Sequence, residues 1–293
     1  PTGSMEKTIM TGDFLIGSRF VYGMRTPNWI GIPYTDIGIF IPSLRFPRFK
    51  DPQVGDVLIF NYPRDKYVKY VKRCIAGPGD TLLIQNKQVY LNGSLTKLPE
   101  NYVFSQPQVP KTMKQKAIYL SSELNINKDN MGPIIIPKKG DYFKIDKNTN
   151  WRELLPIMMM EGNKAELRGN EKTFIFTLQD PFELDRRKNH PSVFEPYFGY
   201  GNGNLITPWS RQILDNHFQY LVINGKSITD WEGYEVKQNY YWAMGDNRDD
   251  SLDSRYWGLI PENFVLGEAL FAYFSLDLRS YIPRFDRIGT IID

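Results

Sequence analysis

The run Met-Gly-Asp-Asn-Arg-Asp-Asp-Ser-Leu-Asp-Ser-Arg-Tyr-Trp-Gly at residues 244–258 constrains this chain more than any other segment. It gathers acids, arginines and serines in one short stretch, and its glycine, asparagine and aspartate residues permit tight turns. Opposite charges at this density can pair within the loop and hold it in one shape. The stretch therefore predicts a rigid polar loop that presents side chains for chemistry. The alternative is a charged turn without a catalytic role.

The same stretch resembles the signature Gly-Asp-Asn-Arg-x-x-Ser-x-Asp-Ser-Arg of type I signal peptidases, the bacterial enzymes that use a Ser-Lys dyad. Every fixed position of that signature is matched, by Gly245, Asp246, Asn247, Arg248, Ser251, Asp253, Ser254 and Arg255. A motif match needs its structural partners. For this family the partners are a serine nucleophile and a lysine base.

A serine in the expected order stands near the start of the chain. Ser4 lies in the tripeptide Gly-Ser-Met, and Thr8 and the pair Gly12-Asp13 follow at the family's spacing. The resemblance implies that Ser4 is the nucleophile. One departure is Lys7, which stands where proline is usual, so the turn after the nucleophile lacks the fixed φ of proline. Gly-Ser-Met is also a common cloning remnant, but a remnant would not account for the downstream matches.

The lysine follows in the run Tyr-Val-Lys-Arg-Cys-Ile-Ala-Gly-Pro-Gly-Asp at residues 70–80, which resembles the family's Lys-Arg-x-x-Gly-x-Pro-Gly-Asp, although Ala76 replaces the usual glycine. The resemblance makes Lys72 the general base. Apolar alternation before it and a turn after it predict a buried strand with the amine facing inward. Burial should lower the pKa of Lys72 from about 10.4 toward neutrality. The alternative is a strand-end lysine that reaches water, and of the two neighbours Arg73 is predicted to be the exposed one.

The resemblance implies further roles around these two residues. Thr2 would assist the backbone N–H of Ser4 in the oxyanion hole, and Ser251 would orient the Lys72 amine by a hydrogen bond. Catalysis would then need no histidine. The chain has two histidines, His190 and His217, and neither lies in a pattern of the Ser-His-Asp type.

Charge pairing within the signature is expected to support the base. Asp253 and Arg255 would pair with each other and hold the loop, with Asp246 and Arg248 as further supporting residues. An unpaired Asp253 beside Lys72 would raise the pKa of the amine and disable it as a base. Neutralisation by Arg255 is therefore useful.

Substrate selection is expected at the strand that carries the base. The resemblance implies that Tyr70, Val71 and Met5 contact the substrate and form shallow pockets for small side chains. The backbone of that strand can pair with an extended peptide. This predicts cleavage after Ala-x-Ala-like sites, which end secretory signal peptides.

The resemblance thus implies a membrane-associated serine endopeptidase that removes signal peptides from exported preproteins. Two alternatives stay open: a non-catalytic preprotein-binding module on the same scaffold, and a self-cleaving repressor-type Ser-Lys peptidase. Catalytically dead relatives should lack the serine or the lysine, whereas this chain has both Ser4 and Lys72. The large insertion and the lack of a DNA-binding module argue against the repressor type.

Composition agrees with a β-rich, turn-rich protein. Of 293 residues 14% are aromatic and 20 are prolines, which favours strands and turns over a helical bundle. The net charge of +3, without a long basic block, gives no sign of nucleic-acid binding. The sequence contains no metal-binding or phosphate-binding motif, so no metal or cofactor is expected. The single cysteine, Cys74, is expected to lie in the core, and His217 on a surface helix.

The predicted fold is mainly β: a signal-peptidase-like catalytic β-fold with a large inserted α+β domain. Residues 1–95 and 236–293 would form the catalytic core and residues 96–235 the insertion. A helix is expected at residues 149–161, and its methionines at 158–160 are read as core, with a pliable binding face as the alternative. The predicted strands are 13–19, 57–62, 67–75, 81–84, 88–91, 240–244 and 269–274, with a hairpin turn at Asn92-Gly93.

The chain has no run of 18 apolar residues, so no transmembrane helix is expected within it. The resemblance implies a membrane anchor before Pro1 that this chain does not include. It also implies a location at the bacterial cytoplasmic membrane, with the catalytic domain on the outer, periplasmic face. The aromatic and aliphatic stretch 29–49 could lie at a lipid surface; packing on its own domain is the equal alternative.

Overall fold

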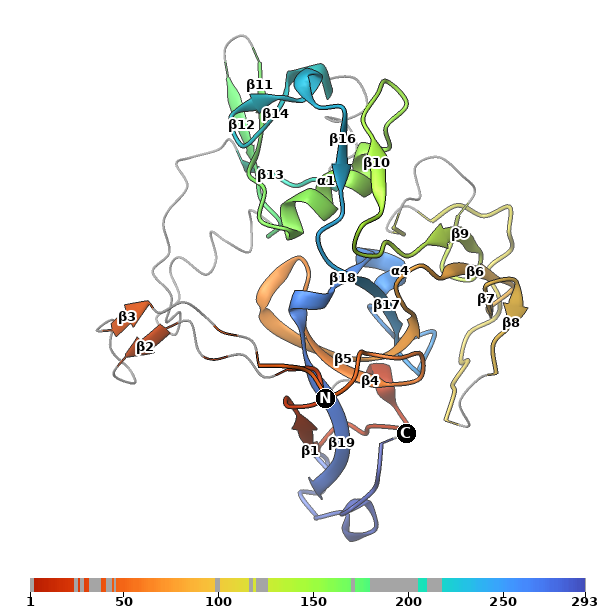
Figure 1. The fold of residues 1–293 in the computed structure, drawn as a ribbon. Helices are drawn as coiled ribbons and strands as arrows, with labels where there is room; N and C mark the ends of the chain where they lie inside the picture. The colour runs from red at the N-terminus through yellow and green to blue at the C-terminus, as the bar shows by residue number, and fades with distance from the viewer. Residues whose placement is uncertain are drawn as a thin grey trace. The chain divides into compact units, whose positions relative to one another are not determined.

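The computed structural model describes residues 3–23, 26, 29–31, 38–40, 44, 46–97, 101–115, 118–119, 126–169, 172–179, 205–209 and 218–292. The chain divides into two compact units. Unit 1 contains Pro1–Met24, Pro47–Gly140 and Gln238–Asp293, and unit 2 contains Arg25–Phe46 and Asp141–Lys237. Each unit is described by itself (Figure 1).

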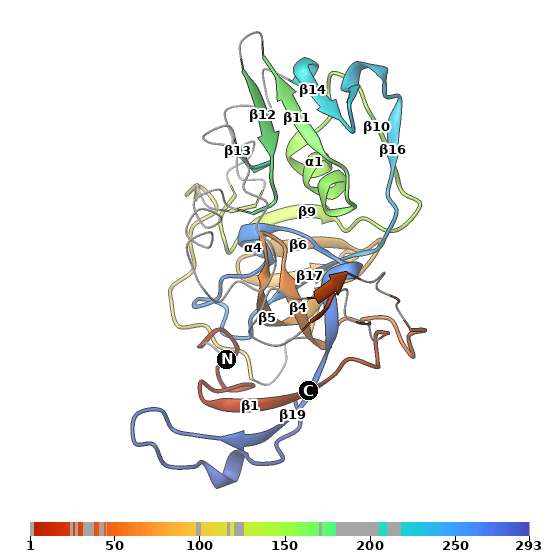
Figure 2. The same cartoon turned by 90° about the vertical axis from the view of Figure 1, so that its left-hand side faces the viewer.

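Unit 1 is built on a six-stranded antiparallel sheet with the order β1-β19-β4-β5-β17-β18. Its strands are β1 (Asp13–Ser18), β4 (Val57–Tyr62), β5 (Asp65–Ala76), β17 (Tyr240–Met244), β18 (Ile260–Pro261) and β19 (Val265–Ser275). Figure 2 shows β1 and β19, from opposite ends of the chain, side by side. The sheet therefore joins the N-terminal and C-terminal parts of the sequence, as the predicted mainly β fold requires.

Register along the β4–β5 pair fixes which side chains share a face. Leu58 lies opposite Lys72, and Phe60 lies opposite Tyr70. Because side chains alternate along a strand, these four residues point to the same side of the sheet. That side carries the main hydrophobic core of unit 1.

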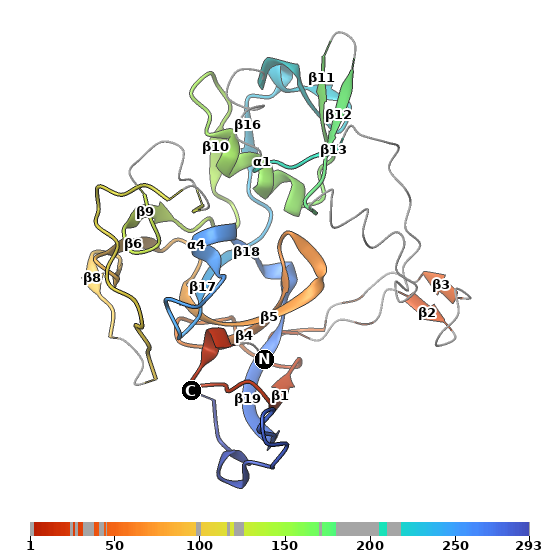
Figure 3. The ribbon, with the colours of Figure 1, turned by 180° about the vertical axis from the view of Figure 1, so that it is seen from behind.

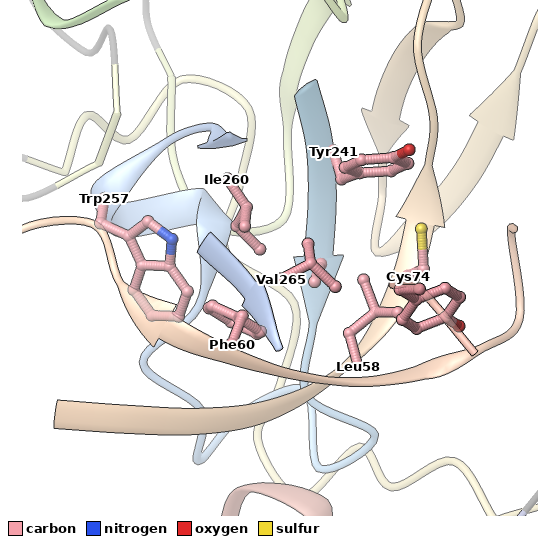
Figure 4. Packing of buried hydrophobic residues seen from close by; sticks show 9 residues of the cluster. Leu58, Phe60, Cys74, Tyr241, Trp257, Ile260 and Val265 are labelled. Carbon is pink, nitrogen blue, oxygen red and sulfur yellow. The ribbon is translucent and has the colours of Figure 1, made fainter. Parts of the chain in front are cut away.

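The core consists of buried residues from the strands of this sheet, together with Tyr22 and with Trp257 from the end of the signature loop. Figure 4 shows this packing, in which aliphatic side chains of β4 and β19 meet aromatic rings. Its buried members are Tyr22, Leu58, Phe60, Cys74, Tyr241, Ala243, Trp257, Ile260 and Val265. Cys74 is fully buried, which confirms its assignment to the core.

A second sheet of unit 1 has the order β8-β7-β6-β9. Its strands are β6 (Thr81–Gln85), β7 (Gln88–Leu91), β8 (Ser94–Leu95) and β9 (Met131–Ile135). The predicted hairpin at Asn92-Gly93 is confirmed, since both residues have positive φ, 53° and 81°, between the paired strands β7 and β8. Two successive positive φ values are what a tight hairpin turn requires.

Short helical turns complete unit 1. They are η1 (Gly3–Met5), α4 (Ser254–Trp257), η4 (Glu262–Phe264) and η5 (Phe285–Arg287). Figures 1 and 3 both show α4 close to β17, from which the signature loop leads into it. The loop therefore begins at a fully buried strand and ends at a short helix.

Among its described residues, unit 2 has one α-helix and three small sheets. Helix α1 (Trp151–Met160) lies within the predicted range, and its three consecutive methionines are buried, which confirms the core interpretation. The strands are β2 (Trp29–Gly31), β3 (Gly38–Phe40), β10 (Tyr142–Lys144), β11 (Ala165–Arg168), β12 (Thr173–Phe176), β13 (Leu205–Ile206), β14 (Leu221–Ile223), β15 (Lys226–Ser227) and β16 (Gly233–Glu235), with the turns η2 (Phe218–Tyr220) and η3 (Ile228–Asp230). They pair as β2-β3, β10-β16 and β13-β12-β11-β14-β15.

The border between the units differs from the predicted border of the insertion. Residues 96–140 belong to unit 1, because β9 pairs with β6 and because Val103 forms a parallel bridge with Asn247. These pairings are distant in sequence and leave no local signal. The division into separately folding domains stays a prediction. No helix in the described part of the chain has the length and apolarity needed to cross a bilayer.

Candidate active site

Ser4 lies in the short turn η1 near the start of unit 1. Backbone hydrogen bonds from Glu6 to Gly3 and from Ile9 to Met5, at 3.1 and 2.7 Å, close this turn. Ser4 is buried. The turn thus presents its hydroxyl to the interior of the unit.

Lys7 adopts a φ of 75° directly after this turn. Proline is restricted to a φ near −65° and cannot take that conformation. The backbone at position 7 therefore has a positive φ that the family's usual proline could not adopt.

Lys72 reaches Ser4 from strand β5. Its Nζ lies 2.7 Å from Ser4 Oγ and 3.1 Å from the carbonyl oxygen of Val71. The side chain is only 2% exposed. Burial lowers the pKa of Lys72 to about 8, although the charges of Asp253 and Asp246 act in the opposite direction. The structure thus brings together a serine hydroxyl and a lysine amine that is partly neutral near pH 8.

Asp253 and Arg255 form the buried centre of the signature loop. Arg255 Nη2 lies 2.8 Å from Asp253 Oδ2, and Arg255 Nε donates to the other oxygen at 2.9 Å. Gly245 donates its backbone N–H to the same carboxylate at 3.1 Å. Burial would raise the pKa of Asp253, but the charge and hydrogen bonds of Arg255 lower it. Asp253 therefore remains an anion that ties both ends of the loop together.

Asp246 joins the loop to the strand of the base and to the turn of the nucleophile. Its carboxylate accepts hydrogen bonds from Arg73 at 2.7 and 2.8 Å and from the Thr8 hydroxyl at 2.6 Å. Arg73 is only 3% exposed, so its predicted exposure is wrong. Alternation correctly turns Arg73 away from Lys72, but the opposite face of β5 is covered by the signature loop and is not open to water.

Asn247 contacts the nucleophile's backbone directly. Its N–H donates to the carbonyl oxygen of Ser4 at 3.1 Å, and its side-chain amide donates to the carbonyl of Gly3 at 3.1 Å. Space is also limited here: a Cβ at Gly245 would lie 2.4 Å from the Ser4 carbonyl oxygen. Only glycine fits between the loop and the turn.

Other predicted residues have different surroundings. Arg248 is buried, and its guanidinium lies 4.0 Å from the ring centroid of Tyr102. Burial lowers the pKa of Arg248. Ser251 is buried beside Gly245. Among the described residues the Lys72 amine makes its hydrogen bonds to Ser4 and Val71, so an orienting bond from Ser251 stays a prediction.

The three residues predicted to contact the substrate differ in how far they are exposed to solvent. Tyr70 and Val71 are half-buried on β5. Met5 is buried in a second core cluster with Ile9 and Val57, and its Sδ accepts the backbone N–H of Asp246 at 3.4 Å. Thr2, His190 and His217 lie outside the described residues.

Sequence reasoning missed a clasp formed by Asp249, a variable position of the signature. Its carboxylate binds Lys87 at 2.9 Å and Lys128 at 2.8 Å and accepts the backbone N–H groups of Ser105 and Gln106. The two hydrogen bonds hold residues 105–106 against the signature loop, and the ion pairs hold Lys87 and Lys128 against it. The only feature of the sequence that could have indicated these contacts is the pair of adjacent aspartates, Asp249 and Asp250, in the signature.

The chain is similar to known proteins along most of its length. The profile of the family described as "Signal peptidase, peptidase S26" matches residues 1–150 and 184–274. "Signal peptidase I" of Buchnera aphidicola subsp. Baizongia pistaciae is 27% identical over 99% of this chain and 74% of its own length. The same enzyme of Buchnera aphidicola subsp. Acyrthosiphon pisum is 27% identical over 99% and 73%, and that of Pseudomonas aeruginosa 23% over 99% and 69%.

The family profile covers both the turn that holds Ser4 and the strand that holds Lys72, and it continues through the signature loop at residues 244–258. The match therefore includes the parts of the chain that meet at the buried serine and lysine. The chain belongs to the signal peptidase family, peptidase S26.

Proposed function

We propose that this signal peptidase cleaves its substrates with Ser4 as nucleophile and Lys72 as general base. The observation that carries the proposal is the 2.7 Å contact between Ser4 Oγ and Lys72 Nζ. A pKa of about 8 for Lys72 gives a substantial neutral fraction at mildly alkaline pH. A neutral amine at hydrogen-bond distance is what a general base requires.

The reaction balances with these two groups. The neutral Lys72 amine takes the Ser4 proton while Ser4 Oγ bonds to the scissile carbonyl carbon. The resulting ammonium returns that proton to the departing amine as the C–N bond breaks. Water then attacks the acyl-enzyme ester while the same amine takes its proton, and the ammonium gives that proton to the Ser4 oxygen as the ester C–O bond breaks. Thr2, together with the backbone N–H of Ser4, is the proposed donor pair to the oxyanion.

The substrate is proposed to bind as a strand beside Tyr70 and Val71. Strand β17 pairs with β5 only through Arg73–Ala76 within the described registers, so it leaves the edge at Tyr70 and Val71 to another strand. An extended peptide can add to such an edge, and alternate side chains then enter pockets. Half-buried walls at these two positions favour small side chains, as in Ala-x-Ala sites of signal peptides.

The supporting residues are proposed to keep the dyad neutral and in place. Asp253 and Asp246 each lie within a hydrogen-bonded ion pair, with Arg255 and Arg73 respectively. Pairing limits how far these carboxylates can raise the pKa of Lys72. Arg248 and Ser251 would fix the loop from the side of Tyr102 and Gly245.

A lipid surface is the proposed second partner, since signal peptides are apolar segments of exported preproteins. Within the stretch 29–49 of the chain, Ile39, Leu44, Phe46 and Phe49 are exposed, Phe49 to 86%. The segment after β19 in unit 1 also exposes Leu278, Tyr281, Ile282 and Phe285. Large exposed apolar side chains favour insertion at the headgroup level. The proposed location is the outer face of the bacterial cytoplasmic membrane.

Vesicles of phosphatidylethanolamine and phosphatidylglycerol test this partner. Replacing both Leu44 and Phe49 by serine, or both Tyr281 and Phe285 by serine, should weaken co-sedimentation if the respective segment inserts. Binding that is unchanged in both double variants would exclude both segments.

The dyad is tested with a purified preprotein in detergent and mass measurement of both products. Ser4→Ala and Lys72→Ala should each abolish cleavage, and the double variant should be scarcely worse than either, because the two residues act as a unit. Lys69→Ala is the matched control, since Lys69 is an exposed lysine of the same strand. Normal cleavage by Ser4→Ala, or losses that add, would overturn the dyad. A binding module would retain the preprotein without cutting it.

A further inference from the structure

Four aromatic rings form a cluster beside the proposed base in unit 1. Phe60 and Tyr62 come from β4, Tyr70 from β5 and Trp257 from α4. The rings of Tyr70 and Trp257 are stacked, 5.3 Å apart and 9° from parallel. Tyr62 meets both of them edge-on, at 4.9 and 5.2 Å. The Tyr70 ring is thus held between neighbours that fix its plane.

Lys72 lies at the end of this cluster. Tyr70 and Lys72 are two positions apart on β5 and share one face of the sheet. The Lys72 Nζ is 5.1 Å from the Tyr70 ring centroid. The ring acts on the amine in two opposite ways, since its π face favours the ammonium and its bulk keeps water away. Burial is the largest influence on the pKa of Lys72 and lowers it. The Tyr70 ring, whose centroid lies 5.1 Å from Nζ, covers part of the amine.

Trp257 is well fixed for a supporting role. It is only 1% exposed. Its ring lies beside that of Phe60, with the centroids 6.2 Å apart (Figure 4). Trp257 ends helix α4, and Asp253 caps the N-terminus of this helix by accepting the backbone N–H of Arg255. Arg64 donates to the carbonyl of Tyr256 at 3.0 Å. The signature loop therefore determines where the indole lies.

We propose that Trp257 is a positioning residue for the catalytic base: by stacking on Tyr70, it holds that ring against the Lys72 amine and keeps water from it. The proposal rests on the proposed function, because it takes Lys72 as the base. It extends the role of the signature loop beyond charge pairing to the packing around the amine.

The other groups that face the amine must be included in a test by pH. The charges of Asp253 and Asp246 in the signature loop act on Lys72, and the Ser4 hydroxyl faces it from η1. Tyr70 faces it from the same strand, and burial raises the pKa of this phenol, so it stays neutral. Position 58 of β4, opposite the lysine, is an apolar leucine. A change at Trp257 leaves all of these groups in the chain.

The first test is the pH dependence of kcat/KM in Trp257→Leu. Without the indole the Tyr70 ring can move and water can reach the amine. The rise in rate should then shift to higher pH by roughly half a unit or more. Activity lost near neutral pH should return under alkaline conditions. Trp257→Phe retains a ring and should shift the rise by less.

The second test asks whether Trp257 acts through Tyr70. Tyr70→Leu should shift the rise in the same direction, and adding Trp257→Leu to it should shift the rise no further. Shifts that add would show two independent effects and would overturn the proposal. If Trp257→Leu does not fold, Trp257→Phe and its combination with Tyr70→Leu answer the same question.

Trp242→Leu is the matched control. Trp242 is another fully buried tryptophan of unit 1, and its indole N–H, like that of Trp257, makes no hydrogen bond among the described residues. Its ring contacts Tyr119. Trp242→Leu should lower the free energy of unfolding without changing the pH at which kcat/KM rises. A uniform loss of rate at every pH in Trp257→Leu, matching the control, would reduce Trp257 to a structural residue.

Amine labelling separates this inference from the proposed function. The pH at which Lys72 becomes reactive toward an acylating reagent, read by peptide mass spectrometry, does not depend on turnover. It should be higher in Trp257→Leu than in the unmodified chain. A shift in labelling without any cleavage by the unmodified chain would retain the positioning role and refute the function. Equal labelling in both proteins, with cleavage intact, would retain the proposed function and refute the positioning role of Trp257.

Discussion

Asn247 donates its backbone N–H to the carbonyl oxygen of Ser4 at 3.1 Å, which joins the signature loop to the nucleophile across 243 positions of sequence. The bond holds the peptide unit that follows Ser4. Its side-chain amide also donates to the carbonyl of Gly3. The loop therefore fixes the backbone of the nucleophile, in addition to any effect on its hydroxyl.

Gly245→Ala should damage this contact most directly. The new Cβ would lie 2.4 Å from the Ser4 carbonyl oxygen and 2.3 Å from Ser251 Oγ, so the turn of the nucleophile must move. A displacement of about 1 Å at the reacting groups costs on the order of 10²-fold in rate. Cleavage kinetics and a urea titration measure both effects. Gly77→Ala is the control, since its Cβ would meet only Asp80 at 3.7 Å. Unchanged kcat in Gly245→Ala would refute the close approach.

The cleavage rate should rise with pH through about 8. Below that value the Lys72 amine of the folded protein is mostly protonated and cannot accept the Ser4 proton. Above it the amine is neutral and the rate should reach a plateau. Measurements of kcat/KM from pH 5.5 to 10 on a slowly cleaved peptide, where chemistry limits the rate, test this. A flat profile would contradict Lys72 as the base.

Strand positions could be predicted from the sequence because apolar alternation is local. The predicted ranges 57–62, 88–91 and 240–244 agree with β4, β7 and β17. Strand β5 begins two residues earlier than predicted, at Asp65. The prediction that Lys72 faces inward near the end of a strand is confirmed for the same reason. Alternation indicates which face the side chain is on, and the turn at residues 77–80 indicates where the strand ends.

Contacts across long sequence distances could not be predicted in this way. Alternation turns Arg73 away from Lys72 but cannot say that Asp246 covers that second face. The clasp of Asp249 with Lys128 joins positions 121 residues apart and leaves no periodic signal. Family resemblance identified the signature residues, but their partners outside the signature follow only from the fold.

Lys72→Met should stabilise the protein while abolishing cleavage. The pKa of Lys72 falls from 10.5 to about 8 on folding, so at pH 7 the folded state carries a penalty on the order of 3 kcal/mol. The penalty is fully present below pH 8 and disappears as the pH rises toward 10.5, because only there does the unfolded lysine also lose its proton. Urea unfolding at pH 7 and 9.5 should show a gain that shrinks at the higher pH. Lys69→Met, at an exposed position, should change stability by less than about 0.5 kcal/mol.

Lys7→Pro should be harmful although proline is usual at this position in the family. The φ of 75° at Lys7 is closed to proline, so the turn after Ser4 would have to rebuild. We expect a loss of more than about 1 kcal/mol in unfolding free energy and a lower kcat. Lys7→Gly adopts a positive φ without strain and should be at least as stable as the unmodified chain. Proline that is tolerated as well as glycine would show that the positive φ is not required.

Asp253→Asn should destabilise the protein and also shift the pH profile. It leaves the Arg255 guanidinium buried without its anion, which costs about 3–5 kcal/mol. The charge of Asp253 raises the pKa of Lys72, so its removal should move the rise in cleavage rate to lower pH. Adding Arg255→Met to Asp253→Asn removes the uncompensated charge, and the double variant should recover part of the lost stability in a urea titration. The double variant should also retain the lower-pH profile, since the carboxylate is still missing. A double variant less stable than Asp253→Asn alone would mean that Arg255 stabilises the loop through contacts other than its ion pair.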